Sequence, residues 1–263
     1  MEFWNAVTIR DNIYYQARLG PLQIFIVKQG NELKISESRL SGEDLSSENW
    51  ESEVSPIQPG DALESEGWKR WIVSAENFSL QFSPMMPNRP VIVRPESQIQ
   101  LLPGGKTRFY VSIPLWLRIM TGDKQVLTEI PTLILSNIWF GDQIAGELCY
   151  AIKSQAMTNF EKRKMKVYTA VCPILIENQS EKSFIFQRLS IHTEYLGVFL
   201  GTKHLWTNQI EVKLEGEEQK SVIDISENAP GIEKIKEKLS DAREVPSKKF
   251  YRKVFSELPF IRG

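Results

Sequence analysis

The chain has 263 residues, 41% hydrophobic and 25% charged, which is typical of globular proteins and enough for one large or two small domains. Its 32 Lys and Arg residues nearly balance its 33 Asp and Glu residues, so a net charge of −1 excludes a generally basic nucleic-acid binder. The longest uncharged stretches have 12 residues. Since a membrane-spanning helix needs about 18–20, no transmembrane segment is expected.

Cysteine and histidine are scarce: the chain contains Cys149, Cys172, His192 and His204. The N-terminus shows no signal-peptide pattern, so we expect two free thiols in the cytoplasm. The four residues are too widely spaced along the chain for a structural zinc site. The sequence therefore predicts no metal and no cofactor.

The N-terminal part reads as strands interrupted by an acidic segment. Leu22 to Lys28 is apolar and β-branched, and Gly30-Asn31 follows as a turn, which predicts a hairpin with the next strand. Residues 37–66 then carry nine acidic side chains against the single base Arg39. This segment is either an acidic loop or contains short strands of its own.

The middle of the chain contains the longest alternating run, Arg108 to Met120. Pro114 cannot donate to a ladder, so this run is expected to be an edge strand or to carry a bulge. Pro131 to Phe140 is apolar on both faces and predicts a buried central strand. Gly141-Asp142 turns it into another strand at Gly146 to Ser154.

A charged run at 161–166 marks the predicted domain boundary. Five strand-like segments and their turns follow, typical of a small sandwich. Beyond Pro230-Gly231, apolar residues spaced three and four apart predict two short helices separated by Pro246. The predicted fold is all-β: an N-terminal β domain over 1–160, a sandwich over 161–229 and a helical tail over 230–263.

One candidate ligand site combines Trp116 with the stretch from Glu129 to Glu147, where Glu129 and Asn137 would lie on the same face as Trp139 if the strand is regular. Carboxylates beside tryptophan rings suit sugar binding, and a pair of them suits glycoside hydrolysis. The alternative is a Trp-anchored core with a surface turn. The candidate residues are Trp116, Arg118, Glu129, Asn137, Trp139, Asp142 and Glu147.

A second candidate is the last predicted helix, where an aromatic stripe faces a basic one. Such a helix can lie on an anionic membrane or dock in a groove of a partner. The alternative is that the aromatic stripe packs on the protein's own sandwich. The residues concerned are Lys248, Lys249, Tyr251, Arg252, Lys253 and Phe255.

A third candidate is His192 with Glu194, two residues apart, so that in a strand the carboxylate would orient the imidazole. The favoured alternative is a surface histidine beside a surface glutamate. Of the two possible nucleophiles, Cys172 is in phase with buried positions. Cys149 is in phase with Glu147, which predicts that it is the more exposed and reactive thiol.

Three stretches resemble an uncharacterised, largely archaeal prokaryotic family catalogued as a domain of unknown function. They are Pro87 to Pro95, Tyr110 to Trp116, and Glu129 to Ala151, the last containing Trp-Phe-Gly and Gly-Glu-Leu-Cys-Tyr-Ala. The resemblance covers about residues 68–200. It implies no catalytic residue, since none is assigned in that family.

Two functions remain open at this point. The first is a non-enzymatic binding or adaptor module that reaches an unknown protein partner through a strand edge or the closing helix, with homo-oligomers possible. The second is a carbohydrate-binding protein or hydrolase built around Trp116 and Trp139. A weaker alternative is peripheral membrane binding by the basic tail.

Overall fold

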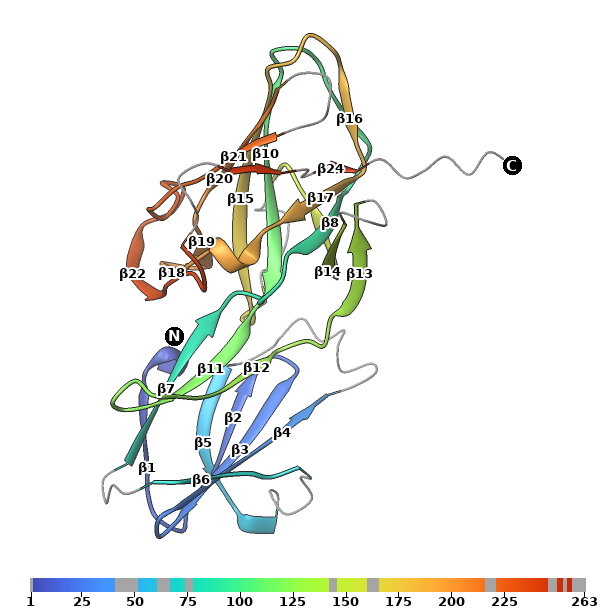
Figure 1. Ribbon diagram of the computed structural model, residues 1–263. Helices are drawn as coiled ribbons and strands as arrows, with labels where there is room; N and C mark the ends of the chain where they lie inside the picture. The colour runs from blue at the N-terminus through green and yellow to red at the C-terminus, as the bar shows by residue number, and fades with distance from the viewer. Residues whose placement is uncertain are drawn as a thin grey trace. The chain divides into compact units, whose positions relative to one another are not determined.

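Alternating apolar and polar side chains favour β-strands, which make up almost all of the regular secondary structure of the described residues (Figure 1). The computed structural model describes residues 2–40, 52–60, 67–73, 78–141, 146–159, 166–215, 221–245, 250–252 and 255–256. Short 3-10 helices occur at η1 (Glu2–Trp4) and η3 (Thr193–Tyr195). The all-β prediction is confirmed.

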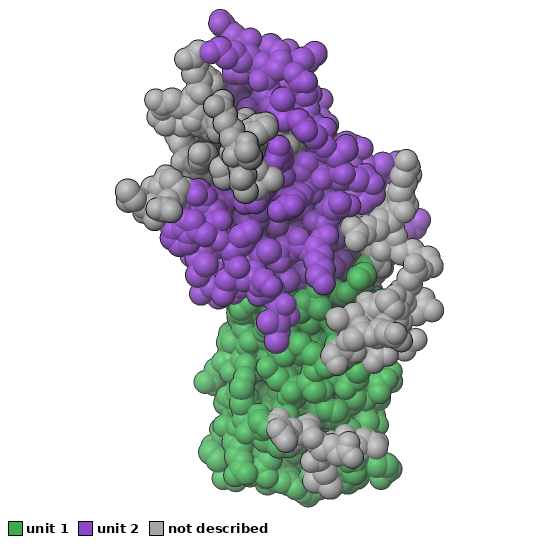
Figure 2. Space-filling view, turned by 90° about the vertical axis from the view of Figure 1, so that its right-hand side faces the viewer, with its two compact units in different colours: residues 1–84, 115–133, 166–168 green, residues 85–114, 134–165, 169–263 purple. Residues whose placement is uncertain are grey.

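The chain forms two compact units, each assembled from three separate stretches (Figure 2). Unit 1 comprises residues 1–84, 115–133 and 166–168, and unit 2 comprises 85–114, 134–165 and 169–263. This arrangement differs from the predicted consecutive division at residues 160 and 229, because the chain passes between the units several times.

The described residues of unit 1 form two sheets. The first has the order β1-β7-β11-β12 and the second the order β5-β2-β3-β4-β6. The strands of the first are β1 (Ala6–Ile9), β7 (Phe78–Met85), β11 (Trp116–Thr121) and β12 (Val126–Pro131). Those of the second are β2 (Tyr14–Leu19), β3 (Leu22–Gln29), β4 (Glu32–Arg39), β5 (Ser52–Ile57) and β6 (Lys69–Ile72).

The predicted hairpin is present as β3 and β4, joined by a turn at Gly30. The acidic segment contributes at both of its ends to the same sheet, since β4 extends to Arg39 and β5 pairs with β2. Residues 41–51 and 61–66 lie outside the described residues. The described part therefore agrees with the alternative in which this segment contains a short strand.

In the part of unit 2 that the structure describes there are three sheets. An eight-stranded sheet has the order β22-β18-β19-β15-β20-β21-β23, with β10 also paired to β15; a five-stranded sheet has the order β13-β14-β8-β17-β24; β16 and β9 form a third. The larger sheet contains β10 (Lys106–Pro114), β15 (Thr169–Asn178), β18 (Val198–Gly201), β19 (Leu205–Thr207), β20 (Ile210–Leu214), β21 (Ser221–Ile225), β22 (Ile235–Ser240) and β23 (Phe250–Arg252). The others are β8 (Val91–Pro95), β9 (Ile99–Leu101), β13 (Ser136–Phe140), β14 (Glu147–Ala156), β16 (Phe184–Phe186), β17 (Arg188–Ile191) and β24 (Phe255–Ser256).

The core of unit 2 follows the alternation of its central strands. Phe109, Val111 and Ile113 of β10 are fully buried, as are Cys172 and Ile176 of β15. The buried Trp206 packs with Val171 and Phe199. Burial of these large side chains is the main stabilising contribution in this unit.

The predicted strand from Arg108 to Met120 is two strands in two units. β10 ends at Pro114, which has no N–H to continue the ladder, and β11 begins at Trp116. The alternation continues across the break because Leu115 and Leu117 are both buried. The alternation of apolar residues in the sequence therefore does not indicate that the chain passes from unit 2 to unit 1 here.

The expected buried central strand over 131–140 was wrong. β12 ends at Pro131, and β13 covers only Ser136–Phe140 as the first strand of its sheet. Ile134 and Trp139 are exposed there. Apolar composition on both faces thus marks an edge strand with an exposed hydrophobic side chain.

The predicted helical tail was also wrong in the part that the structure describes. Ile235 and Leu239 lie in β22, because a spacing of four residues fits a strand of period two as well as a helix. Further on, β23 pairs with β21 and β24 pairs with β17. A short isolated helix is marginal in water, whereas pairing with a sheet edge satisfies the backbone.

Candidate functional site

His192 and Glu194 form a buried pair at the end of β17. His192 follows the last residue of that strand and Glu194 lies in η3. The imidazole Nδ1 lies 2.9 Å from Glu194 Oε1, and both residues are buried. The predicted contact is therefore confirmed, but the alternative of a surface pair is wrong.

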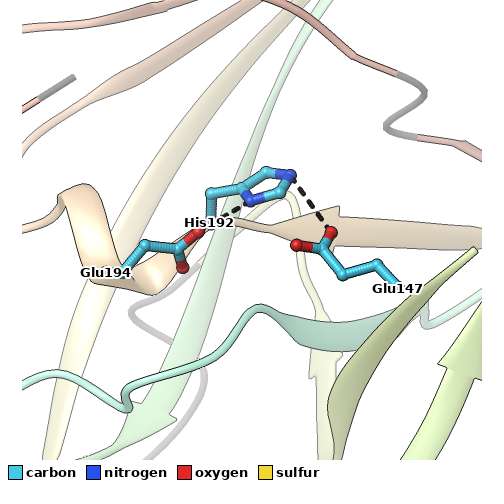
Figure 3. A group of neighbouring side chains, drawn as sticks. All are labelled: Glu147, His192 and Glu194. Atoms are coloured by element: carbon cyan, nitrogen blue, oxygen red, sulfur yellow. Dashed lines mark hydrogen bonds and ion pairs between the residues drawn. The ribbon is translucent and has the colours of Figure 1, made fainter. Parts of the chain in front are cut away.

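Glu147 approaches the same imidazole from β14 (Figure 3). Its Oε2 lies 3.9 Å from His192 Nε2, and one ligand atom from each of Glu147, His192 and Glu194 lies within 4.8 Å of the others. Strands β14 and β17 both pair with β8, which brings the two segments together. No local spacing in the sequence links Glu147 to His192, so sheet order alone reveals this partner.

The backbone around η3 is anchored within unit 2. The hydroxyl of Thr193 donates a hydrogen bond of 2.7 Å to the carbonyl of Arg89, and the amide of Glu244 donates to the carbonyl of Glu194. The second carboxylate oxygen of Glu194, Oε2, is buried and accepts no hydrogen bond from the described residues. Such an atom normally has a partner, because burying a carboxylate oxygen without one costs free energy.

Cys149 lies two residues beyond Glu147 on the same face of β14, where it packs with Ile92 and Phe140. Its thiol is fully buried. Desolvation by burial, together with the negative charges of Glu147 and Glu194, raises the pKa of Cys149 to about 12. The expectation of an exposed, reactive Cys149 was wrong because this face of β14 is turned to the core.

The other histidine belongs to a carboxylate cluster of a different kind. Burial tends to raise the pKa of Glu233, but hydrogen bonds from the amide of Lys203, from His204, from Thr202 and from Trp206 outweigh it and lower the pKa to about 2. His204 Nδ1 and Trp206 Nε1 each lie 2.8 Å from Oε2. With both of its oxygens engaged, Glu233 joins the turn between β18 and β19 to the segment before β22.

The predicted ligand residues of β11 and β12 lie in unit 1. Arg118 and Glu129 are cross-strand partners, and Arg118 Nη2 lies 2.6 Å from Glu129 Oε1. Trp116 is partly buried at the start of β11. The Glu129 carboxylate is thus paired with a guanidinium on its own sheet.

The remaining predicted ligand residues belong to unit 2, apart from Asp142, which lies outside the described residues. Asn137 and Trp139 share one face of the β13–β14 pair with Leu148 and Tyr150, their cross-strand partners. Glu147 is the partner of Phe140 and lies on the opposite face. Trp139 and Glu147 are therefore separated by their own sheet.

The described residues of the predicted tail helix lie in strands. Tyr251 and Arg252 lie in β23, and Phe255 lies in β24. Lys248, Lys249 and Lys253 fall outside the described residues. In the part of the chain that the structure describes, no helix is long and apolar enough to cross a membrane.

Comparison with known proteins places the chain in a family without adding a function. No curated protein matches it, and no solved structure does. A family model described as "Protein of unknown function (DUF432)" matches residues 3–261, far beyond the stretch of about 68–200 that carries the resemblance. The match covers nearly the whole chain, which therefore belongs to this family of unknown function.

Proposed function

We propose that the protein is a non-enzymatic binding module that takes up an extended segment of a partner protein along the free edge of β13. The observation that supports this most directly is the exposure of Trp139, 49% accessible on the outermost strand of its sheet. Exposed aromatic side chains are enriched at protein interfaces, where they act as anchors.

The backbone of β13 offers the hydrogen bonds for such a segment. Among the described residues, β13 pairs with β14 on one side and with no strand on the other. An added strand would satisfy its outward N–H and C=O groups, which is the usual mode of β-augmentation.

The side chains beside this edge favour an apolar segment that also carries an acidic residue. Leu148, 40% exposed, is the cross-strand partner of Trp139 and extends the apolar surface. The guanidinium of Arg89 lies 5.6 Å from the ring centroid of Tyr150 and donates to Asn137 Oδ1 at 3.3 Å. It adds a positive charge to the same face.

The proposal includes a protein partner rather than a nucleic acid, and a cytoplasmic location. The net charge of −1 gives no general attraction for polyanions. Cys149 and Cys172 are free, buried thiols, as is usual for proteins of reducing compartments. A second copy of this chain could add its own β13 at the same edge, which would make the partner a homo-oligomer.

The test is selection of peptides from a displayed library on the intact protein. We expect enrichment of extended apolar sequences, slower backbone amide exchange over residues 136–140 when they bind, and at least about tenfold weaker binding to Trp139→Ser. Leu102→Ser, at an exposed apolar position directly after β9 in unit 2, is the matched control. Equal binding by the wild type and Trp139→Ser, or no protection of β13, would contradict the proposal.

A carbohydrate is the second candidate for the same face. An exposed indole next to the amide of Asn137 and the ring of Tyr150 offers a stacking surface with a polar neighbour. A glycan array separates the two candidates. Retention of a defined oligosaccharide by the wild type but not by Trp139→Ser would favour the carbohydrate.

A further inference from the structure

We propose that Glu147, His192 and Glu194 form a binding site for a divalent first-row transition-metal ion, with Zn²⁺ as the ion that this ligand set fits best. The site is independent of the proposed function, because Glu147 lies on the face of β14 opposite to Leu148, the cross-strand partner of Trp139.

The geometry needs only a small adjustment to hold an ion. The three ligand atoms lie within 4.8 Å of one another, whereas ligands about 2.0–2.2 Å from a tetrahedral Zn²⁺ lie roughly 3.3 Å apart. The side chain of Glu147 is 36% exposed and can rotate inward, while His192 and Glu194 are fixed by burial. Glu147 would therefore close the site, and its exposed side gives the ion a path of entry.

The state of Glu194 is the second, independent observation. Glu194 is only 8% exposed, its Oε1 contacts the imidazole of the site, and its Oε2 is buried without a hydrogen-bond partner among the described residues. A carboxylate oxygen in this position lacks the positive partner that burial normally requires. A cation bound between Glu194 and Glu147 would supply one.

Charge balance supports the same ligand. Two carboxylates around one neutral imidazole carry a formal charge of −2, which a divalent cation neutralises. Imidazole favours zinc and its neighbours over magnesium and calcium, which prefer oxygen ligands alone. Three protein ligands leave a further coordination position for water.

The second histidine–carboxylate pair in unit 2 shows what a satisfied site looks like. Both oxygens of Glu233 accept hydrogen bonds, from a hydroxyl, backbone amides, an imidazole and an indole. Glu233 therefore has no carboxylate oxygen without a hydrogen-bond donor, in contrast to Oε2 of Glu194. We therefore expect no ion at His204, which makes this pair an internal control.

The experiment is titration of the metal-free, full-length protein with Zn²⁺ against a chromophoric chelator, and with Co²⁺ followed by its ligand-field absorption. We expect one equivalent of each ion to bind, Mg²⁺ not to compete, and the melting temperature to rise with Zn²⁺. Glu147→Gln and His192→Gln should each weaken Zn²⁺ binding at least about a hundredfold. His204→Gln should leave it unchanged.

Folding is checked for every variant by its thermal transition without metal. Glu147→Gln carries the test if the variant at the buried His192 does not fold, because the Glu147 side chain is partly exposed and its replacement is isosteric. Absence of stoichiometric Zn²⁺ binding by the wild type would overturn the proposal, as would equal binding by Glu147→Gln. Trp139→Ser should bind Zn²⁺ as the wild type does. The outcome of the Zn²⁺ titration is therefore independent of whether β13 binds a partner.

Discussion

The indole Nε1 of Trp206 donates a hydrogen bond of 2.8 Å to Oε2 of Glu233, which joins the largest fully buried side chain of unit 2 to an anionic cluster. Thr202 and His204 donate to the same carboxylate from the turn between β18 and β19. One side chain from the segment before β22 thus holds both the turn and the core tryptophan, since bonds to a charged acceptor are stronger than neutral ones.

This cluster predicts a defined loss of stability in acid. The pKa of Glu233 is about 2 in the folded protein against an ordinary value of 4.5. A carboxyl with a depressed folded pKa contributes stability above its unfolded pKa, and that contribution is lost as the pH falls from about 4.5 towards 2. Glu233→Gln should therefore lower the free energy of unfolding by up to about 3 kcal/mol at pH 7.

Urea denaturation of both proteins at pH 7 and pH 3 measures this difference. The difference in free energy of unfolding between the wild type and Glu233→Gln should be smaller at pH 3 than at pH 7. Glu237→Gln, at an exposed position on β22, serves as the control and should change little at either pH. If this difference in free energy of unfolding does not change with pH, the negative charge of Glu233 does not contribute to stability.

Two glycines with the same backbone angle offer a matched pair in unit 1. Gly20 and Gly30 both have φ of +58°, but a Cβ on Gly20 would lie 2.1 Å from Cδ1 of Tyr168, whereas Gly30 has open space around it. Gly30→Ala should cost about 1–2 kcal/mol for the left-handed backbone alone. Gly20→Ala should cost roughly 1–3 kcal/mol more, because the Tyr168 ring must move.

Chemical denaturation of the two alanine variants gives both values under identical conditions. If the two variants lose the same stability, the Tyr168 ring moves aside freely and packing at Gly20 is loose. Tyr168→Ala combined with Gly20→Ala identifies the cause, since the double variant should recover the part of the loss due to the clash.

Strand content could be predicted from the sequence because the period of two is strong in segments such as β10 and β20. Burial alternates along Ile210–Leu214 as the sequence predicts, and the strand lies beside β15. The tail could not be predicted, since the spacing of Ile235 and Leu239 fits both periods. Only pairing with β18, contributed by a different segment, decides between strand and helix.

The candidate site was predictable only where its residues are close in sequence. His192 and Glu194 are two residues apart, and their contact follows from that spacing. Glu147 enters through the order of β14, β8 and β17 in one sheet, which no local pattern encodes. Likewise, the sequence pattern predicted Glu129 and Trp139 on one face of a regular strand. In the structure Glu129 lies on β12 in unit 1 and Trp139 on β13 in unit 2, and no local pattern marks this change of unit.

The ion pair between Arg118 and Glu129 is predicted to be structural. Both side chains are partly exposed, and they are cross-strand partners on β11 and β12. A double-mutant cycle with Arg118→Ala and Glu129→Ala should give a coupling free energy of about 0.5–1 kcal/mol. Added salt should reduce it, since exposed charges are screened. A coupling free energy near zero would show that the pair contributes nothing to stability.

The two cysteines are predicted to be unreactive in the native protein. Desolvation raises the pKa of Cys172 to about 12. Desolvation and the negative charges of nearby carboxylates raise the pKa of Cys149 to about 12 as well. Neither thiol therefore provides appreciable thiolate near pH 8. An aromatic disulfide reagent should label no thiol on the timescale of minutes, and should label both once the chain is unfolded in denaturant.

Labelling of single-cysteine variants then ranks the local stability of their strands. Cys149 lies on β14, next to the edge strand β13, whereas Cys172 lies on β15 between β10 and other strands of the largest sheet. The thiol of Cys149 in Cys172→Ser should therefore react faster than that of Cys172 in Cys149→Ser, because strands near a sheet edge open at lower free-energy cost. The reverse order would mean that β13 and β14 are held more firmly than their place in the sheet implies.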